Sequence, residues 1–109
     1  MDAFEAVARA EFERRAVAHL QRTLPERCAA MGPAAVLASV RDAIARAARY
    51  GVTAEVDVLT FLNVMYMLDF AFDTDPRFPW AREWLRDGEL QGGVKARLVF
   101  ERARRELFT

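Results

Sequence analysis

The feature that most constrains this chain is a long apolar stretch, VDVLTFLNVMYMLDFAF, which occupies residues 56–72. Wound as a helix, the stretch is apolar on almost every side, and such a helix is normally buried by several neighbours. A membrane-spanning helix is the rival interpretation, but the stretch is short for that purpose and contains Asp57, Asn63 and Asp69. We therefore expect a central helix over residues 54–72 inside a soluble domain, with no membrane as partner.

Amphipathic segments flank this central helix on both sides. Phe4, Ala8, Phe12, Ala16 and Leu20 recur every four residues, with Val7 and Val17 beside them, which is the spacing of one helix face. The amphipathic segments cover residues 2–23, 33–50, 79–87 and 94–108. No segment alternates apolar and polar residues as a strand does. The predicted fold is all-α: a single domain over residues 1–109, built as a compact bundle of about five helices around the central one.

Prolines and glycines mark the expected helix boundaries. Pro25 should stop the first helix, because proline disfavours helical backbone in the residue before it. Gly51 should end the second, where a left-handed residue is wanted. The short stretch after Pro25, which carries Cys28, is predicted to be a loop. Prolines that should start helices are Pro33 and Pro79, and the expected N-caps are Asp2 and Thr53.

Charge and cysteine content exclude several classes of function. Sixteen basic residues balance sixteen acidic ones, so no bulk field attracts nucleic acid. Basic residues of the last helix, from Lys95 to Arg105, interleave with Glu101 and Glu106 and predict a solvated face with helical ion pairs.

Cys28 is the single cysteine, so the chain can form no internal disulfide. With no secretory signal at the N-terminus, we expect a cytoplasmic protein.

The sequence contains no recognisable catalytic set. Ser39 and His19 are the only serine and histidine, and they lie on different predicted helices, whereas a triad needs them in contact. A glycine pair at residues 92–93 lacks the strand and the lysine–serine pattern of a phosphate-binding loop. We therefore expect no catalytic residue, no cofactor and no metal site.

Three aspartates near the end of the central helix, Asp69, Asp73 and Asp75, are candidates for structural polar roles. An EF-hand is excluded because Pro76 interrupts the loop. The preferred interpretation is that Asp73 or Asp75 caps the turn, while Asp69 pairs with an arginine inside the bundle. The candidate arginines are Arg41, Arg46 and Arg49, the last of which precedes Tyr50. A small metal-dependent enzyme around the three carboxylates is the least favoured alternative.

A short aromatic helix is the strongest candidate for a binding surface. Trp80 and Trp84 lie four residues apart and so share a helix face, with Phe78 just before them. Tryptophan and arginine are enriched at binding hot spots, and Arg82 and Arg86 stand on the same segment. These residues are the predicted partner-binding set. The alternative is that both indoles close the end of the core.

The segment over residues 46–85 resembles a motif of small bacterial proteins that are often encoded beside type VI secretion effector or spike genes. The shared elements are an Arg-Tyr-Gly turn at residues 49–51, a long apolar helix, Phe-Asp at 72–73 and Pro-Trp at 79–80. The resemblance implies an accessory role, as adaptor, chaperone or cognate inhibitor of a secreted effector. It implies no enzymatic activity.

The function that the sequence favours is thus a non-enzymatic protein-binding accessory protein. The expected partner is another protein, such as a secreted effector or a spike component. A self-associating structural protein, with the same apolar surface forming a symmetric homodimer, is the second hypothesis.

Overall fold

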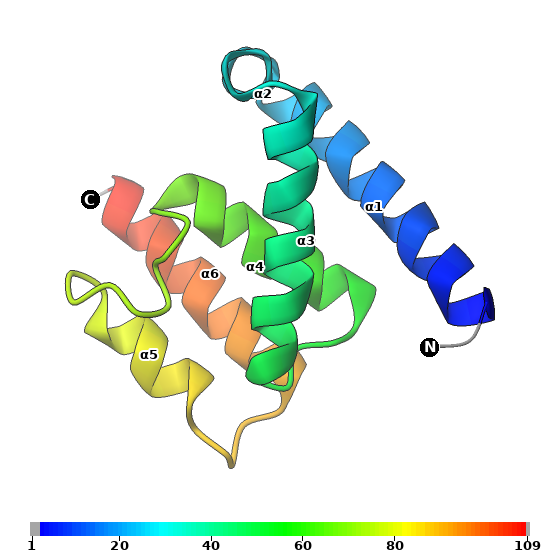
Figure 1. The fold of residues 1–109 in the computed structure, drawn as a ribbon. Coiled ribbons are helices and arrows are strands. Elements are labelled where there is room, and N and C mark those ends of the chain that lie inside the picture. Colours follow the sequence, from blue (N-terminus) through cyan, green and yellow to red (C-terminus); the bar gives the residue numbers. More distant parts are fainter. Residues whose placement is uncertain (1–2, 109) are drawn as a thin grey trace. The chain divides into compact units, whose positions relative to one another are not determined.

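The computed structural model describes residues 3–108, with side chains described from residue 6 onward (Figure 1). The expected N-cap Asp2 lies outside the described residues. Those residues form helices joined by turns and contain no strand, which confirms the all-α prediction. The helices are α1 (Ala3–Thr23), α2 (Pro25–Met31), α3 (Pro33–Arg49), α4 (Glu55–Met67), α5 (Pro79–Leu85) and α6 (Gly92–Phe108).

The chain divides into two compact units, one ending at Asp42 and the other beginning at Ala43. Helix α3 runs through this boundary. The first unit contains α1, α2 and the beginning of α3; the second contains the end of α3 and the three later helices.

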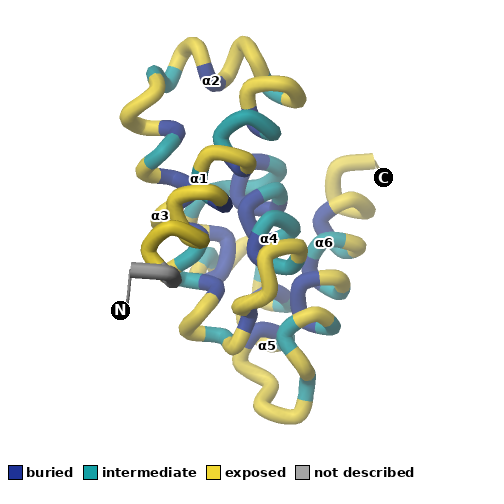
Figure 2. Tube along the Cα trace, turned by 90° about the vertical axis from the view of Figure 1, so that its right-hand side faces the viewer, coloured by how far each residue is buried: buried dark blue, intermediate teal, exposed yellow. Residues whose placement is uncertain are grey.

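In the first unit, the predicted periodicity of α1 is confirmed over residues 12–20, but not nearer the start of the helix, where Val7 and Ala8 are exposed. Phe12, Ala16 and Leu20 are buried, whereas the residues between them are exposed or only partly buried, as the banded tube of Figure 2 shows. Apolar residues that recur every four positions lie on one face, as a helix with a single buried side requires.

The expected loop after α1 is instead a helix, so that prediction was wrong. Pro25 does end α1 at Thr23, but it also occupies the first turn of α2. Proline is favoured there because that position needs no N–H donor and its backbone angle is already helical. Cys28 is consequently a buried residue of α2. Gly32, at φ +85°, then turns the chain into α3.

In the second unit, α4 and α6 pack side by side, and α5 lies along α6 (Figure 1). Small buried residues of α6, Ala96 and Ala103 among them, allow this close approach. The beginning of α6 is especially tight, because a Cβ added at Gly92 would lie 2.3 Å from the carbonyl oxygen of Gly51. Gly51 has φ +78° and ends the turn that follows α3, as predicted.

Helix α4 is shorter than the predicted central helix. It begins at Glu55, after Ala54 rather than Thr53 as N-cap, and it ends at Met67 instead of residue 72. Its first turn is not buried all round, since Val56 is 71% exposed. The apolar residues of α4 that are buried are Val58, Phe61, Leu62, Val64, Met65 and Tyr66.

Asp69 explains why the helix stops early. Its side-chain Oδ1 accepts the N–H of Ala71 at 2.9 Å, and its carbonyl accepts the N–H of Phe72 at 3.1 Å. An aspartate that bonds the backbone two residues on offers the chain a turn in place of another helical turn. The turn directs Phe72 and Asp73 inward, where both are buried.

Candidate functional site

A buried ion pair between Arg46 and Asp73 lies in the second unit. The carboxylate of Asp73 is paired through Oδ1 with the Arg46 guanidinium, and both side chains are largely buried. Tyr50 donates its hydroxyl to Oδ2 of Asp73 at 2.7 Å. Arg46 also donates to the carbonyl oxygen of Phe70. Because a buried charge is costly unless it is paired and hydrogen-bonded, these contacts explain how Asp73 is tolerated inside the protein.

Lys95 extends this network to α6. Its ammonium donates to the carbonyl oxygen of Tyr50 at 2.8 Å, and only 7% of the residue is exposed. The prediction of a solvated basic face was therefore wrong for Lys95, although Arg102 does pair with Glu106 at 2.8 Å, as expected for that face. A sequence signal existed: Lys95 precedes Val99 by four residues and so shares its buried side.

The predicted roles of Asp69 and Asp73 are exchanged in the structure. Asp69 was expected to pair with an arginine inside the bundle, but its side chain is 46% exposed and lies 3.5 Å from Arg77. Asp73, one of the two aspartates expected to cap the turn, is the residue that pairs with Arg46. The physical reason is the early end of α4, because the aspartate nearest the helix end forms the turn and the next one faces inward.

Asp75 supports the same turn, as predicted. It accepts the backbone N–H of Arg77 at 2.9 Å and the guanidinium of the same residue at 2.7 Å. These side-chain and backbone hydrogen bonds hold the pKa of the Asp75 carboxyl below its usual value of 3.8. The side-chain hydrogen bond to Asp75 and the negative charge of that carboxylate raise the pKa of the Arg77 guanidinium.

The three aspartates do not converge on a common point. Asp73 turns toward Arg46, while Asp69 and Asp75 both approach Arg77. Within residues 3–108, no group of three or more His, Cys, Asp or Glu is arranged to hold a metal ion. The arrangement stabilises a turn and anchors it to α3, and it presents no shared cation site.

The aromatic residues of the predicted binding set form one contiguous cluster. Phe78 and Trp80 meet edge to face at 5.9 Å, and Trp80 and Trp84 lie 5.9 Å apart between ring centres. The guanidinium of Arg102, on α6, sits 5.4 Å from the centre of the Trp80 ring. All three aromatic residues are partly exposed. We call Phe78, Trp80, Trp84 and Arg102 together the tryptophan cluster.

Arg82 and Arg86 stand apart from this cluster. Ala81 and Leu85 are the buried residues of α5, and at about 100° per residue the two tryptophans flank them on one side and the two arginines on the other. Both arginines are exposed and line a surface hollow of about 490 Å³. The predicted binding set is thus divided between two sides of the helix.

A second hollow of the same unit is lined by basic side chains. Its volume is about 610 Å³, and its lining residues are Arg49, Tyr50, Leu85, Arg86 and Lys95. No acidic residue is among them. We call this hollow the basic pocket. Arg49 was expected as a structural partner for an aspartate, whereas it lines this pocket as an exposed residue.

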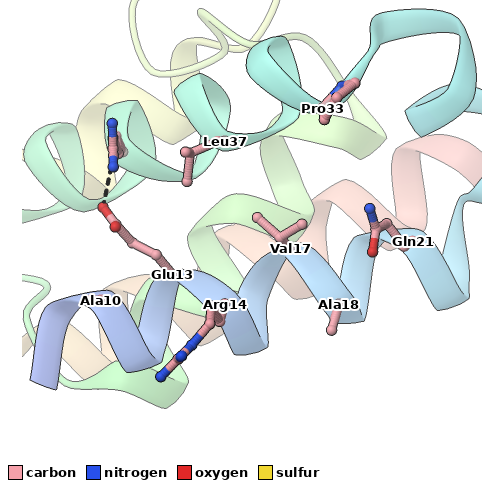
Figure 3. Close-up of a pocket in the computed structure, with 9 residues that line it drawn as sticks. Ala10, Glu13, Arg14, Val17, Ala18, Gln21, Pro33 and Leu37 are labelled. Carbon is pink, nitrogen blue, oxygen red and sulfur yellow. Dashed lines mark hydrogen bonds and ion pairs between the residues drawn. The ribbon is translucent and has the colours of Figure 1, made fainter. Parts of the chain in front are cut away.

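The first unit has its own groove, between α1 and α3 (Figure 3). Val17 and Leu37 approach each other across it, and Arg41 and Glu13 close one end with an ion pair of 3.0 Å. Its volume is about 470 Å³. The lining mixes small apolar residues with polar ones, and its one carboxylate, that of Glu13, is paired with Arg41.

The candidate nucleophiles noted in the sequence lie in this unit as well. Ser39 is buried, and its hydroxyl donates to the carbonyl oxygen of Val36 in its own helix at 2.6 Å. Cys28 is buried on α2, and His19 is partly buried on α1.

Comparison with known proteins gives no family assignment: no protein-family model matches the chain, and no match appears among curated proteins or solved structures. Among the described residues, no single helix has both the length and the apolar character needed to cross a bilayer. Helices α2 and α3 reach those values only when joined, and they meet at an angle of 104°.

Proposed function

We propose that this chain is a non-enzymatic accessory protein that binds another protein through the tryptophan cluster. The observation that carries the proposal is the pair Trp80–Trp84, whose tilted rings lie 5.9 Å apart between centres and are still partly exposed. Large rings held in place before binding contribute contact area at little cost in side-chain entropy, and tryptophan is enriched at binding hot spots.

Arg102 supplies the polar part of this surface. It lies over the Trp80 ring and also pairs with Glu106 at 2.8 Å, so its position is fixed from two sides. An arginine beside exposed indoles is a typical composition for the centre of a protein interface. In this proposal Arg102 replaces Arg82 and Arg86, which lie on the other side of α5.

The proposed partner is a secreted effector or spike component of a type VI secretion system, and the proposed place of action is the cytoplasm. This part rests on the resemblance of residues 46–85. Arg49, Tyr50 and Asp73, which belong to the shared motif, lie in or beside the buried network of the unit that carries the tryptophan cluster.

Copurification with the product of the adjacent gene tests the proposal. Trp80→Ala and Trp84→Ala should each weaken binding by about 2 kcal/mol or more. Phe100→Ala is the matched control, because Phe100 is also a partly exposed ring with an arginine over it, 5.9 Å away. It lies two residues before Arg102 and therefore on another side of α6.

The outcomes separate the possibilities once circular dichroism shows that each variant is folded. Wild-type binding by both tryptophan variants would remove the tryptophan cluster as the interface. Equal weakening by Phe100→Ala would show that the loss is not specific to α5. No binding by the wild-type chain would contradict the proposed partner.

Self-association is a second candidate, favoured by exposed apolar residues at the end of α6. Leu107 is 49% exposed and Phe108 is 82% exposed. Two copies that pack these ends together would cover both residues at a symmetric contact. Size-exclusion chromatography with light scattering decides this: a dimer that Phe108→Ser converts to a monomer supports it, and a wild-type monomer at high concentration removes it.

A further inference from the structure

We propose that the basic pocket binds the phosphate group of a small phosphorylated molecule. This inference goes beyond the proposed protein-binding role and does not depend on it, because no member of the tryptophan cluster lines the pocket. It rests on the charges that surround the pocket, on the absence of an internal counterion and on the pocket's size.

Three cationic side chains from three elements line this one hollow. Arg49 comes from the end of α3, Arg86 from the C-cap of α5 and Lys95 from the first turn of α6. The chain as a whole is neutral, so this is a local concentration of positive charge and not a reflection of composition. Such a site raises the local concentration of anions.

Two nearby carboxylates, those of Asp73 and Asp87, are engaged in other contacts. Asp73 reaches Tyr50 but is already paired with Arg46. Asp87, next to Arg86, accepts the backbone N–H of Glu89 at 2.9 Å. Among the described residues, neither Arg49 nor Arg86 forms an ion pair, although both have the planar donor groups that bind oxyanions in bidentate fashion.

Lys95 is the least expected member of the pocket. It is a buried ammonium whose one hydrogen-bond partner among the described residues is a carbonyl oxygen, that of Tyr50 at 2.8 Å. A carbonyl fixes the position of the ammonium but does not neutralise it. Buried charges are normally compensated by an opposite charge, and an anion in the pocket would supply it.

Phosphate fits this site better than a carboxylate does. It carries more negative charge and three acceptor oxygens, which matches several cationic donors around one hollow. At about 610 Å³ the pocket is also larger than a phosphate group and falls within the range of small-molecule sites. Leu85 and Tyr50 provide apolar wall for the rest of such a molecule.

Titration with inorganic phosphate, followed by NMR at constant ionic strength, tests the assignment. The Nε–H signals of Arg49 and Arg86 should shift, and Arg49→Gln and Arg86→Gln should each weaken phosphate binding about tenfold or more. Both residues are exposed, so these variants should fold. Arg97→Gln is the matched control, since Arg97 is an exposed arginine two residues after Lys95 and therefore on the opposite side of α6.

Acetate and chloride serve as comparison anions. Saturable binding of phosphate, weaker binding of acetate and a selective loss in the two pocket variants would support the proposal. No shift at millimolar phosphate would overturn it, and so would equal weakening by Arg97→Gln, which indicates diffuse attraction. Acetate binding as tight as phosphate binding would contradict phosphate as the ligand. None of these outcomes bears on copurification through the tryptophan cluster.

Discussion

Tyr50 and Asp73 are joined by a hydrogen bond of 2.7 Å although they are 23 residues apart in the chain. The bond connects the end of α3 to the turn that follows α4. With Arg46 on the other carboxylate oxygen, it makes Asp73 a buried anchor for that turn. Since α5 begins a few residues later, the anchor also helps to position the tryptophan cluster.

Removing the Tyr50 hydroxyl should destabilise the protein. Tyr50→Phe keeps the ring but leaves a buried carboxylate oxygen without its donor, so the free energy of unfolding should fall by about 1–3 kcal/mol in urea denaturation. Thr60→Val is the control: its hydroxyl bonds only the Val56 carbonyl of its own helix, and its loss should change stability by less than about 0.5 kcal/mol. Equal effects would refute a special role for Tyr50.

Arg46→Met should cost more, about 3–5 kcal/mol, because it leaves the Asp73 charge buried and unpaired. Adding Asp73→Leu should recover part of this loss, since the uncompensated charge is then gone. Arg41→Gln breaks the pair of a largely exposed arginine with Glu13 and should cost less than about 1 kcal/mol. An Arg46 variant as stable as the Arg41 variant would show that the buried pair is unimportant.

Gly92→Ala should be destabilising by about 1–3 kcal/mol, because the new methyl group would lie 2.3 Å from the backbone oxygen of Gly51. Gly88→Ala is the matched control. A Cβ at Gly88 meets nothing within 4 Å, so the change should be neutral or stabilise by about 0.5–1 kcal/mol. Thermal unfolding of both variants measures the difference. A stable Gly92→Ala protein would mean that α6 can move away from the turn after α3.

Arg77→Gln should raise the pKa of Asp75 toward its usual value, because the guanidinium hydrogen bond and positive charge that lower it are lost, while the backbone hydrogen bond stays. A carboxyl whose pKa is lower in the folded state stabilises that state above its unfolded pKa. The stabilisation from Asp75 is therefore lost as pH falls below about 4, and the variant should lack this contribution. NMR titration of the carboxyl carbon measures the shift. Arg97→Gln should leave the Asp75 pKa unchanged, and an unaltered pKa in Arg77→Gln would contradict the assigned cause.

The sequence by itself determined that the chain is helical and where most of the helices lie, although it missed α2. The periodicity that includes Phe12, Ala16 and Leu20 predicted α1, and Pro33, Gly51 and Pro79 predicted helix boundaries correctly. These signals are local, since a missing N–H or a positive φ acts within one turn of the chain. Pro25 was predicted only in part, because a proline that ends one helix equally suits the first turn of the next.

Only the tertiary structure decided which polar residues are buried and what they meet. Asp69 and Asp73 look alike in the sequence, and the early end of α4 sends one to the surface and the other to Arg46. The basic pocket likewise brings together Arg49, Arg86 and Lys95 from three helices. Side-chain pairing of this kind depends on how distant segments pack, and no spacing along the chain encodes it.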